Sequence, residues 1–234
     1  MNFKPLFQAA ALAGLASLSA AAVAGPSDHS FAWTHVIGSA TLEVNGSNVI
    51  TASNRGWVSD NGSNNFGGAA SNYIVGVCGS SDSCSGGDDD HHNYFAFSVG
   101  NVGNVTSAVL KLYQPSAADT GNANQTGFLS QSSSLSYTLW DALLNPTTDS
   151  GLGLYNDLGS GTSYGSISVD ASTNGTTISI ALNANGLAAL QQSADTGGAF
   201  YIGGAINAVP EPETYALMLL GLAAVGGMAR RRKN

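Results

Sequence analysis

The densest group of potential metal ligands is the acidic and histidine run at residues 88–92. Carboxylate oxygens suit Ca²⁺, and an added imidazole nitrogen favours Zn²⁺. The candidate ligands are Asp88, Asp90 and His92. Neighbouring side chains cannot all face one ion, so another loop must contribute, with Asp60 or Asp82 as possibilities. The alternative is a solvated acidic loop that precedes a strand at residues 94–99 and binds nothing, in which case the protein has no cofactor.

Catalytic patterns are weak in this chain. Residues 161–165 match the G-x-S-x-G motif around Ser163, but that motif requires a strand-to-helix turn and a downstream histidine. All four histidines precede Ser163. A glycoside hydrolase requires two carboxylates about 5–10 Å apart, and nothing in the sequence pairs Asp141 with Asp170. We therefore assign no catalytic residue and expect a protein that is not an enzyme.

Aromatic side chains offer a second kind of chemistry, stacking on the C–H faces of sugar rings. The aromatic residues considered are Trp33, Trp57, Trp140, Tyr155 and Tyr164. Trp57 and Trp140 are the two candidates for carbohydrate stacking. The competing interpretation is that both pack in the core or against loops.

A period of two in hydrophobicity dominates the middle of the chain and predicts half-buried antiparallel strands. The predicted strands are residues 40–44, 48–52, 73–77, 94–99, 106–113, 135–139, 166–169, 177–182 and 199–206. Asn45-Gly46 predicts a hairpin between the first two. One short helix is predicted at residues 184–192. The expected fold is an all-β, jelly-roll-like antiparallel sandwich, with long loops at residues 53–71, 79–90, 116–134 and 145–161.

The charge of the central region excludes one class of partner. Residues 25–209 contain thirteen acidic residues against Arg55 and Lys111, a net charge of −11. Nucleic-acid binding needs clustered Lys and Arg, so we expect none. Cys78 and Cys84 are the only cysteines, and in an exported chain they are expected to form a disulfide.

Both ends of the chain indicate export. Residues 1–24 combine Lys4, an apolar run and an Ala-Val-Ala cleavage pattern, which predicts a signal peptide. Residues 214–229 are uncharged and would span about 24 Å as a helix, close to the thickness of a bilayer core. The basic cluster at residues 230–233 predicts a cytoplasmic C-terminus. The expected domains are a signal peptide at 1–24, an extracellular β-sandwich at 25–208 and a sorting segment at 209–234 with a transmembrane helix.

The C-terminal segment resembles the sorting signal of PEP-CTERM proteins. The resemblance is carried by Val209-Pro210-Glu211-Pro212, the apolar stretch and the basic end. It implies processing by the membrane protease exosortase, a membrane-anchored precursor and a final location at the cell surface or outside the cell. The β-rich region at residues 40–206 is also similar to uncharacterised PEP-CTERM β-sandwich proteins, a resemblance that implies no catalytic residues.

These observations favour a non-enzymatic surface or matrix protein that associates with exopolysaccharide. The first alternative is an extracellular glycoside hydrolase or lyase that acts on that polymer. The second is a structural adhesin without a small ligand.

Overall fold

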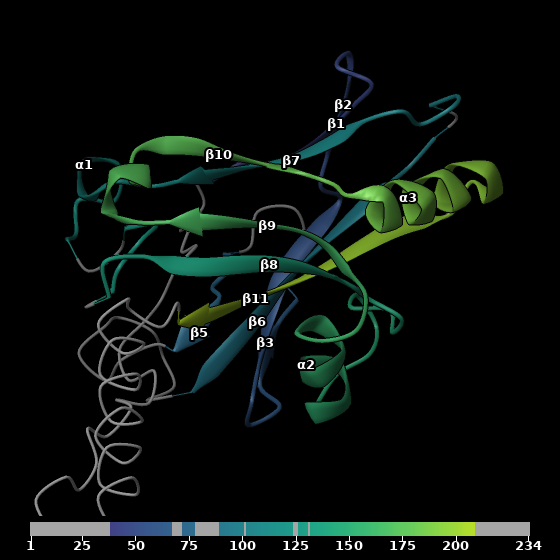
Figure 1. Ribbon diagram of the computed structural model, residues 1–234. Helices are drawn as coiled ribbons and strands as arrows, with labels where there is room; N and C mark the ends of the chain where they lie inside the picture. The colour runs from purple at the N-terminus through teal and green to yellow at the C-terminus, as the bar shows by residue number, and fades with distance from the viewer. Residues whose placement is uncertain are drawn as a thin grey trace, which may run out of the picture.

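The computed structural model describes residues 38–66, 72–77, 89–100, 102–123, 126–130 and 132–208. They form two antiparallel sheets packed face to face, so the prediction of an all-β sandwich is confirmed (Figure 1). Its jelly-roll character stays a prediction. No helix within these residues is both long and apolar enough to cross a membrane.

The smaller sheet has four strands in the order β10-β7-β1-β2. Its strands are β1 (Ala40–Val44), β2 (Asn48–Thr51), β7 (Ala108–Gln114) and β10 (Thr176–Ala181). The hairpin between β1 and β2 turns at Asn45 and Gly46, whose φ angles of 54° and 69° are both left-handed. This is the turn that the Asn-Gly pair predicted, because these residues tolerate positive φ.

The larger sheet has seven strands. Six follow the order β4-β3-β6-β11-β8-β9, and the short β5 also pairs with β6. Its strands are β3 (Asn54–Ser59), β4 (Asn64–Asn65), β5 (Gly76–Val77), β6 (Asp90–Ser98), β8 (Leu135–Asp141), β9 (Ser163–Val169) and β11 (Ala199–Ala208). β11 is central and pairs antiparallel with both β6 and β8.

The main core lies between the sheets. The smaller sheet contributes Leu42, Leu110 and Ile180, and the larger contributes Phe95 and Ile202. The three residues of the smaller sheet belong to the alternately buried sets of their strands, whereas β6 and β11 carry buried residues on both faces around Phe95 and Ile202. The hydrophobic period therefore determines which face of the smaller sheet is buried.

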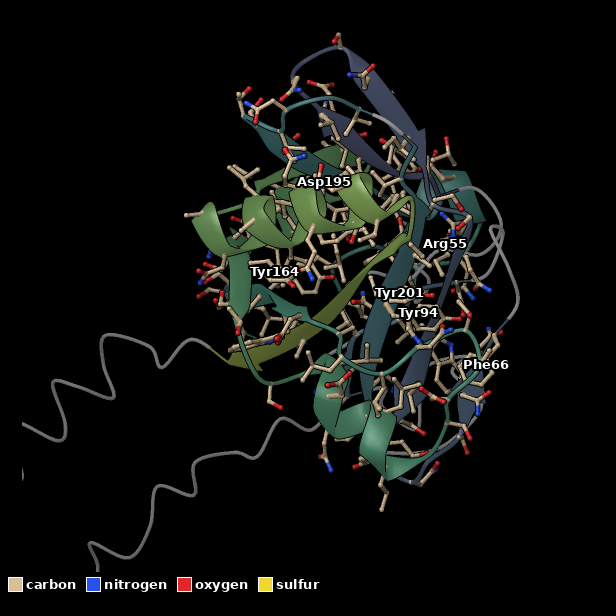
Figure 2. The ribbon with its side chains drawn as sticks, turned by 90° about the vertical axis from the view of Figure 1, so that its right-hand side faces the viewer. Arg55, Phe66, Tyr94, Tyr164, Asp195 and Tyr201 are labelled. Carbon is tan, nitrogen blue, oxygen red and sulfur yellow. The ribbon has the colours of Figure 1, made fainter. Side chains whose placement is uncertain are left out.

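The helices are α1 (Ala117–Thr120), α2 (Leu152–Leu158) and α3 (Ala184–Thr196), with a 3-10 turn at Ala171–Thr173. α3 is the predicted helix. Asn183 caps its start by accepting hydrogen bonds from the amides of Asn185 and Gly186, and Gly197 ends it with φ 65°. α3 packs on β9 and β11, where Figure 2 places Asp195 on the helix and Tyr164 beneath it.

Several elements differ from the predictions. β3 lies inside the predicted loop at 53–71, and α2 lies inside the predicted loop at 145–161. β6 begins at Asp90 instead of residue 94, while only Gly76–Val77 of the predicted strand at 73–77 is paired. β3 was not predicted because the buried charged residue Arg55 interrupts its hydrophobic pattern. The Arg55 guanidinium donates to the Gly38 carbonyl (2.6 Å) and lies 5.0 Å from the Tyr73 ring centre.

A second buried polar side chain, that of Asn93, belongs to β6 of the larger sheet. Asn93 is fully buried; its Oδ1 accepts from the Tyr137 hydroxyl (2.8 Å), and its Nδ2 donates to the Tyr73 carbonyl (3.2 Å). Burial raises the pKa of Tyr137, so this phenol stays protonated. Gly204 leaves room for the pair, since a Cβ there would overlap the Tyr137 hydroxyl and Asn93 Oδ1.

Candidate functional site

The most chemically diverse group of side chains lies on the outer face of the larger sheet, at the start of β6. Alternation along β6 puts Asp90 and His92 on the same face. β3 pairs Val58 with His92, and beyond the end of this pairing the Asp60 amide donates to the Asp90 carbonyl (2.9 Å). Asp60 therefore follows Val58 on the same face and comes beside Asp90.

Helix α2 covers part of this face. Its Leu154 and Leu158 are fully buried against Val58 and Tyr94, a small core separate from the main one. Phe66 extends this core, with its ring centre 6.1 Å from that of Tyr94; Figure 2 shows both residues on this side. The packing explains why a seven-residue segment that contains Gly, Asn and Asp is helical, since its intrinsic preference is weak.

The docked helix brings Tyr155 onto His92. The two rings are parallel within 3°, with centres 4.0 Å apart. His92 Nδ1 lies 2.6 Å from the Tyr155 carbonyl oxygen, and the Tyr155 hydroxyl donates to Asp90 Oδ2 (2.8 Å). Gly159 completes the fit, because a Cβ there would overlap the imidazole ring.

The hydrogen bonds define the state of this imidazole. A carbonyl only accepts, so Nδ1 carries the proton, and in the neutral ring Nε2 has a free lone pair. Burial lowers the pKa of His92, against the opposing effects of the Tyr155 carbonyl and of Asp90 and Asp60. Nε2 lies 4.0 Å from Asp90 Oδ2, too far for a hydrogen bond. Burial and the bond to Asp90 raise the pKa of Tyr155.

His91 takes no part in this group. It lies on the opposite face of β6 and is buried, with Nδ1 3.2 Å from the Gly76 carbonyl oxygen. The Trp57 ring meets it edge-on, with centres 4.7 Å apart. Burial lowers the pKa of His91. The strand thus divides the predicted ligand run between two faces, and Asp90 and His92 are the predicted metal ligands that the structure brings together.

The two tryptophans predicted to stack on sugar are both half-buried. Trp57 also donates its indole N–H to Asn72 Oδ1 (2.8 Å), which fixes the ring against its neighbours. The Trp140 indole nitrogen is buried and has no hydrogen-bond partner among the described residues. Sugar stacking by either ring stays a prediction.

The carboxylates considered for glycoside hydrolysis are far apart. Asp141 ends β8, whereas Asp170 follows Val169, the partner of Leu135 at the other end of that strand. Six residues at about 3.3 Å each separate them by about 20 Å, twice the upper limit for a catalytic pair. Each carboxylate instead binds a local turn: Asp141 accepts from the Thr162 amide (2.7 Å), and Asp170 accepts from the Ser172 amide (2.7 Å).

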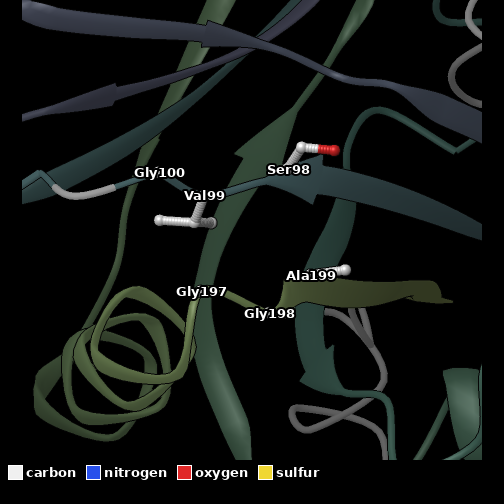
Figure 3. Close-up of a pocket in the computed structure, with 6 residues that line it drawn as sticks. All are labelled: Ser98, Val99, Gly100, Gly197, Gly198 and Ala199. Carbon is white, nitrogen blue, oxygen red and sulfur yellow. The ribbon is translucent and has the colours of Figure 1, made fainter.

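Ser163 is also in the wrong setting for a nucleophile. It is the first residue of β9, so no helix follows it as the G-x-S-x-G motif requires. A hollow of about 390 Å³ lies between the end of β6 and the end of α3 (Figure 3). Its lining consists of Ser98, Val99, Gly100, Gly197, Gly198 and Ala199. None of these side chains is an acid, a base or a metal ligand.

Comparison with known proteins adds a finding at the C-terminus, directly after β11. Residues 208–233 match the family model of the PEP-CTERM protein-sorting motif. The chain carries a PEP-CTERM sorting signal. The motif implies export and a membrane-anchored precursor that exosortase processes. No curated protein and no solved structure matches the chain.

Several predicted features lie outside the residues that the structure describes. They are the signal peptide at 1–24, the transmembrane helix at 214–229, the sorting residues Val209, Pro210, Glu211 and Pro212, the metal ligand Asp88 and the cysteines Cys78 and Cys84. The helix and the disulfide stay predictions. Asp60 is one of the additional ligands that the sequence suggested, whereas Tyr155 had no predicted role at the metal site because α2 was not predicted.

Proposed function

We propose that this PEP-CTERM protein is a cell-surface or matrix protein whose β-sandwich associates with exopolysaccharide without catalysing a reaction. The observation that carries the proposal is the sorting motif, which begins at the last residue of β11. The folded domain is thereby joined directly to the segment that exosortase recognises. Such systems go together with extracellular polymer production, which is the reason for choosing this ligand class.

The outer face of the smaller sheet supports this proposal. No described helix makes a substantial contact with the face; α2 and α3 pack on the larger sheet. Its outward side chains on β10 include Thr177 and Ser179, both exposed, and those on β1 include Thr41. Hydroxyl groups on a flat surface can exchange hydrogen bonds with a neutral polymer, and the domain carries too few basic groups to bind a polyanion.

Tyr113 supplies an aromatic ring on this face. It lies opposite Thr177 in the sheet, and its hydroxyl donates to Asp119 Oδ2 (2.8 Å). This hydrogen bond fixes the ring at the end of the row of hydroxyls. A flat aromatic ring with a polar edge suits contact with a sugar.

The test is co-sedimentation of the purified protein with exopolysaccharide from cells that produce it. We expect the protein to pellet with the polymer and Tyr113→Ala to reduce the bound fraction. Tyr201→Ala, a half-buried tyrosine of the other sheet, serves as the control. Shortened chains or new reducing ends would favour the hydrolase or lyase alternative. A protein that neither binds nor cleaves the polymer would favour the structural adhesin.

Processing is tested separately by the intact mass of protein released from cells. We expect a mass that lacks residues 1–24 and the segment beyond Pro210. Glu211→Ala should leave unprocessed precursor in the membrane. Released protein that still contains Arg230 to Lys233 would contradict processing.

A further inference from the structure

We propose that Asp60, Asp90 and His92 form a binding site for a divalent transition metal such as Zn²⁺. The site lies on the outer face of the larger sheet beneath α2. The site keeps two of the expected ligands, Asp90 and His92, and takes Asp60, the residue that follows β3, as the third. It is independent of the proposed association with polysaccharide.

His92 is oriented as a metal-binding imidazole is. Metal-binding imidazoles almost always donate their second N–H to a carbonyl or carboxylate, which fixes the ring and its tautomer. His92 has this arrangement, with Nδ1 2.6 Å from the Tyr155 carbonyl oxygen and the ring stacked on Tyr155. The Nε2 lone pair is therefore held in one direction before any ligand arrives.

The Asp90 carboxylate lies near the Nε2 lone pair of His92. Nε2 and Asp90 Oδ2 are 4.0 Å apart, and neither atom has a proton to donate to the other. A tetrahedral ion with bonds of about 2.0–2.2 Å holds its ligand atoms about 3.4 Å apart, so the partly exposed Asp90 carboxylate has to move about 0.6 Å toward Nε2 to share an ion with it. The Tyr155 hydroxyl donates to Asp90 Oδ2, so the carboxylate is oriented by a second contact, as ligating carboxylates commonly are.

The negative charge of this site has no basic side chain to balance it among the described residues. Asp60 and Asp90 lie side by side on one face, an arrangement of like charges that is unfavourable in a sheet. The basic residues of the described region are already engaged: Lys111 pairs with Glu43, and Arg55 lies over Tyr73. A divalent cation neutralises both carboxylates at once and reverses the sign of their interaction.

The choice of metal follows from the ligands. One imidazole nitrogen and two carboxylates suit Zn²⁺ and related ions, whereas Ca²⁺ prefers six to eight oxygens. The described residues contain no group of three such side chains already gathered at coordination distance. Asp60 is exposed and a third of the Asp90 side chain is exposed, so both carboxylates have room to turn toward an ion at Nε2. Water fills the remaining coordination position.

The test uses the full chain without affinity-tag histidines, purified in detergent and stripped of metal. Zn²⁺ is titrated in competition with a chromophoric chelator, and Co²⁺ binding is followed by visible absorption. We expect one strong site per chain. His92→Phe keeps a ring stacked on Tyr155 but removes Nε2, and we expect it to weaken binding at least tenfold. Asp60→Asn, an exposed change that leaves the fold intact, should also weaken binding at least tenfold.

Asp195→Asn is the matched control, because it removes the same charge from an exposed position on α3. We expect it to bind Zn²⁺ like the unmodified protein. Absence of a strong site, or equal affinity in His92→Phe and the unmodified protein, would overturn the proposal. Equal losses in Asp60→Asn and Asp195→Asn would also overturn it, because they would mean that general electrostatic attraction holds the ion.

Discussion

Removal of the Tyr137 hydroxyl tests how much the buried polar pair contributes to the sandwich. In Tyr137→Phe the ring stays, but fully buried Asn93 Oδ1 loses its 2.8 Å donor. A buried acceptor left without its partner costs about 1–3 kcal/mol of unfolding free energy. For a domain of this size, about 2 kcal/mol lowers the melting temperature by about 4–8 °C.

Gly204→Ala, a change on β11, perturbs the same hydrogen-bonded pair of Asn93 and Tyr137. The new methyl group would overlap both the Tyr137 hydroxyl and Asn93 Oδ1, so at least one side chain must move. Overpacking of this kind costs about 1–3 kcal/mol. Because both changes act on one hydrogen bond, their combined effect should be smaller than the sum of the two single effects.

The assay is denaturant unfolding followed by fluorescence and circular dichroism, with coincident transitions as the check on two-state behaviour. Tyr201→Phe is the control for the lost hydroxyl, and Gly100→Ala, which has open space around its Cβ position, is the control for the added methyl group. Both controls should stay within about 0.5 kcal/mol of the unmodified protein. If Tyr137→Phe also stays within that range, the pair does not stabilise the fold and the reasoning fails.

Three further predictions concern α2, alkaline pH and the cysteines. Gly159→Ala should lower the unfolding free energy by about 1–3 kcal/mol in the same assay, because a methyl group there overlaps the imidazole beneath α2; an unchanged midpoint would contradict the described contact. Stability should fall as pH rises above about 10, since burial raises the pKa of Tyr94 in the folded state while the unfolded chain releases this proton near its ordinary value. Urea midpoints that are equal at pH 8 and pH 11 would argue against this. Cys78 and Cys84 should yield no free thiol in exported protein that is unfolded without reductant, and two reactive thiols would exclude the disulfide.

The sequence predicted those parts of the fold that depend on local alternation. β1, β7, β8 and β10 each show a clean period of two, so their buried faces follow from the chain alone. β3 did not, because Arg55 and Gly56 occupy buried positions that only the loop at Tyr73 and the close approach of Tyr94 explain. Long-range packing therefore determines that these residues form a strand, and the local sequence pattern does not.

The candidate site, too, could be predicted from the sequence only in part. Asp90 and His92 stand out in the sequence as potential ligands. That His91 turns away from them follows only once β6 is known to begin at Asp90. The position of Asp60 beside Asp90 depends on pairing between strands 30 residues apart, and the carbonyl at His92 depends on a helix formed by packing.

The central position of β11 has a mechanical consequence. This strand runs directly into the sorting segment. Residues 202–204 pair with both β6 and β8, and residues 205–208, nearest the tail, pair with β8. Until the tail is cut, a pull on the tail is transmitted to the C-terminal end of β11. Because the ladder bonds are perpendicular to the strands, a pull along β11 loads the row of hydrogen bonds to β8 in shear, and the row to β6 shares the load from residue 204 inward. An edge strand pulled sideways would instead break its bonds one after another, so a strand loaded in shear is the more resistant tether point.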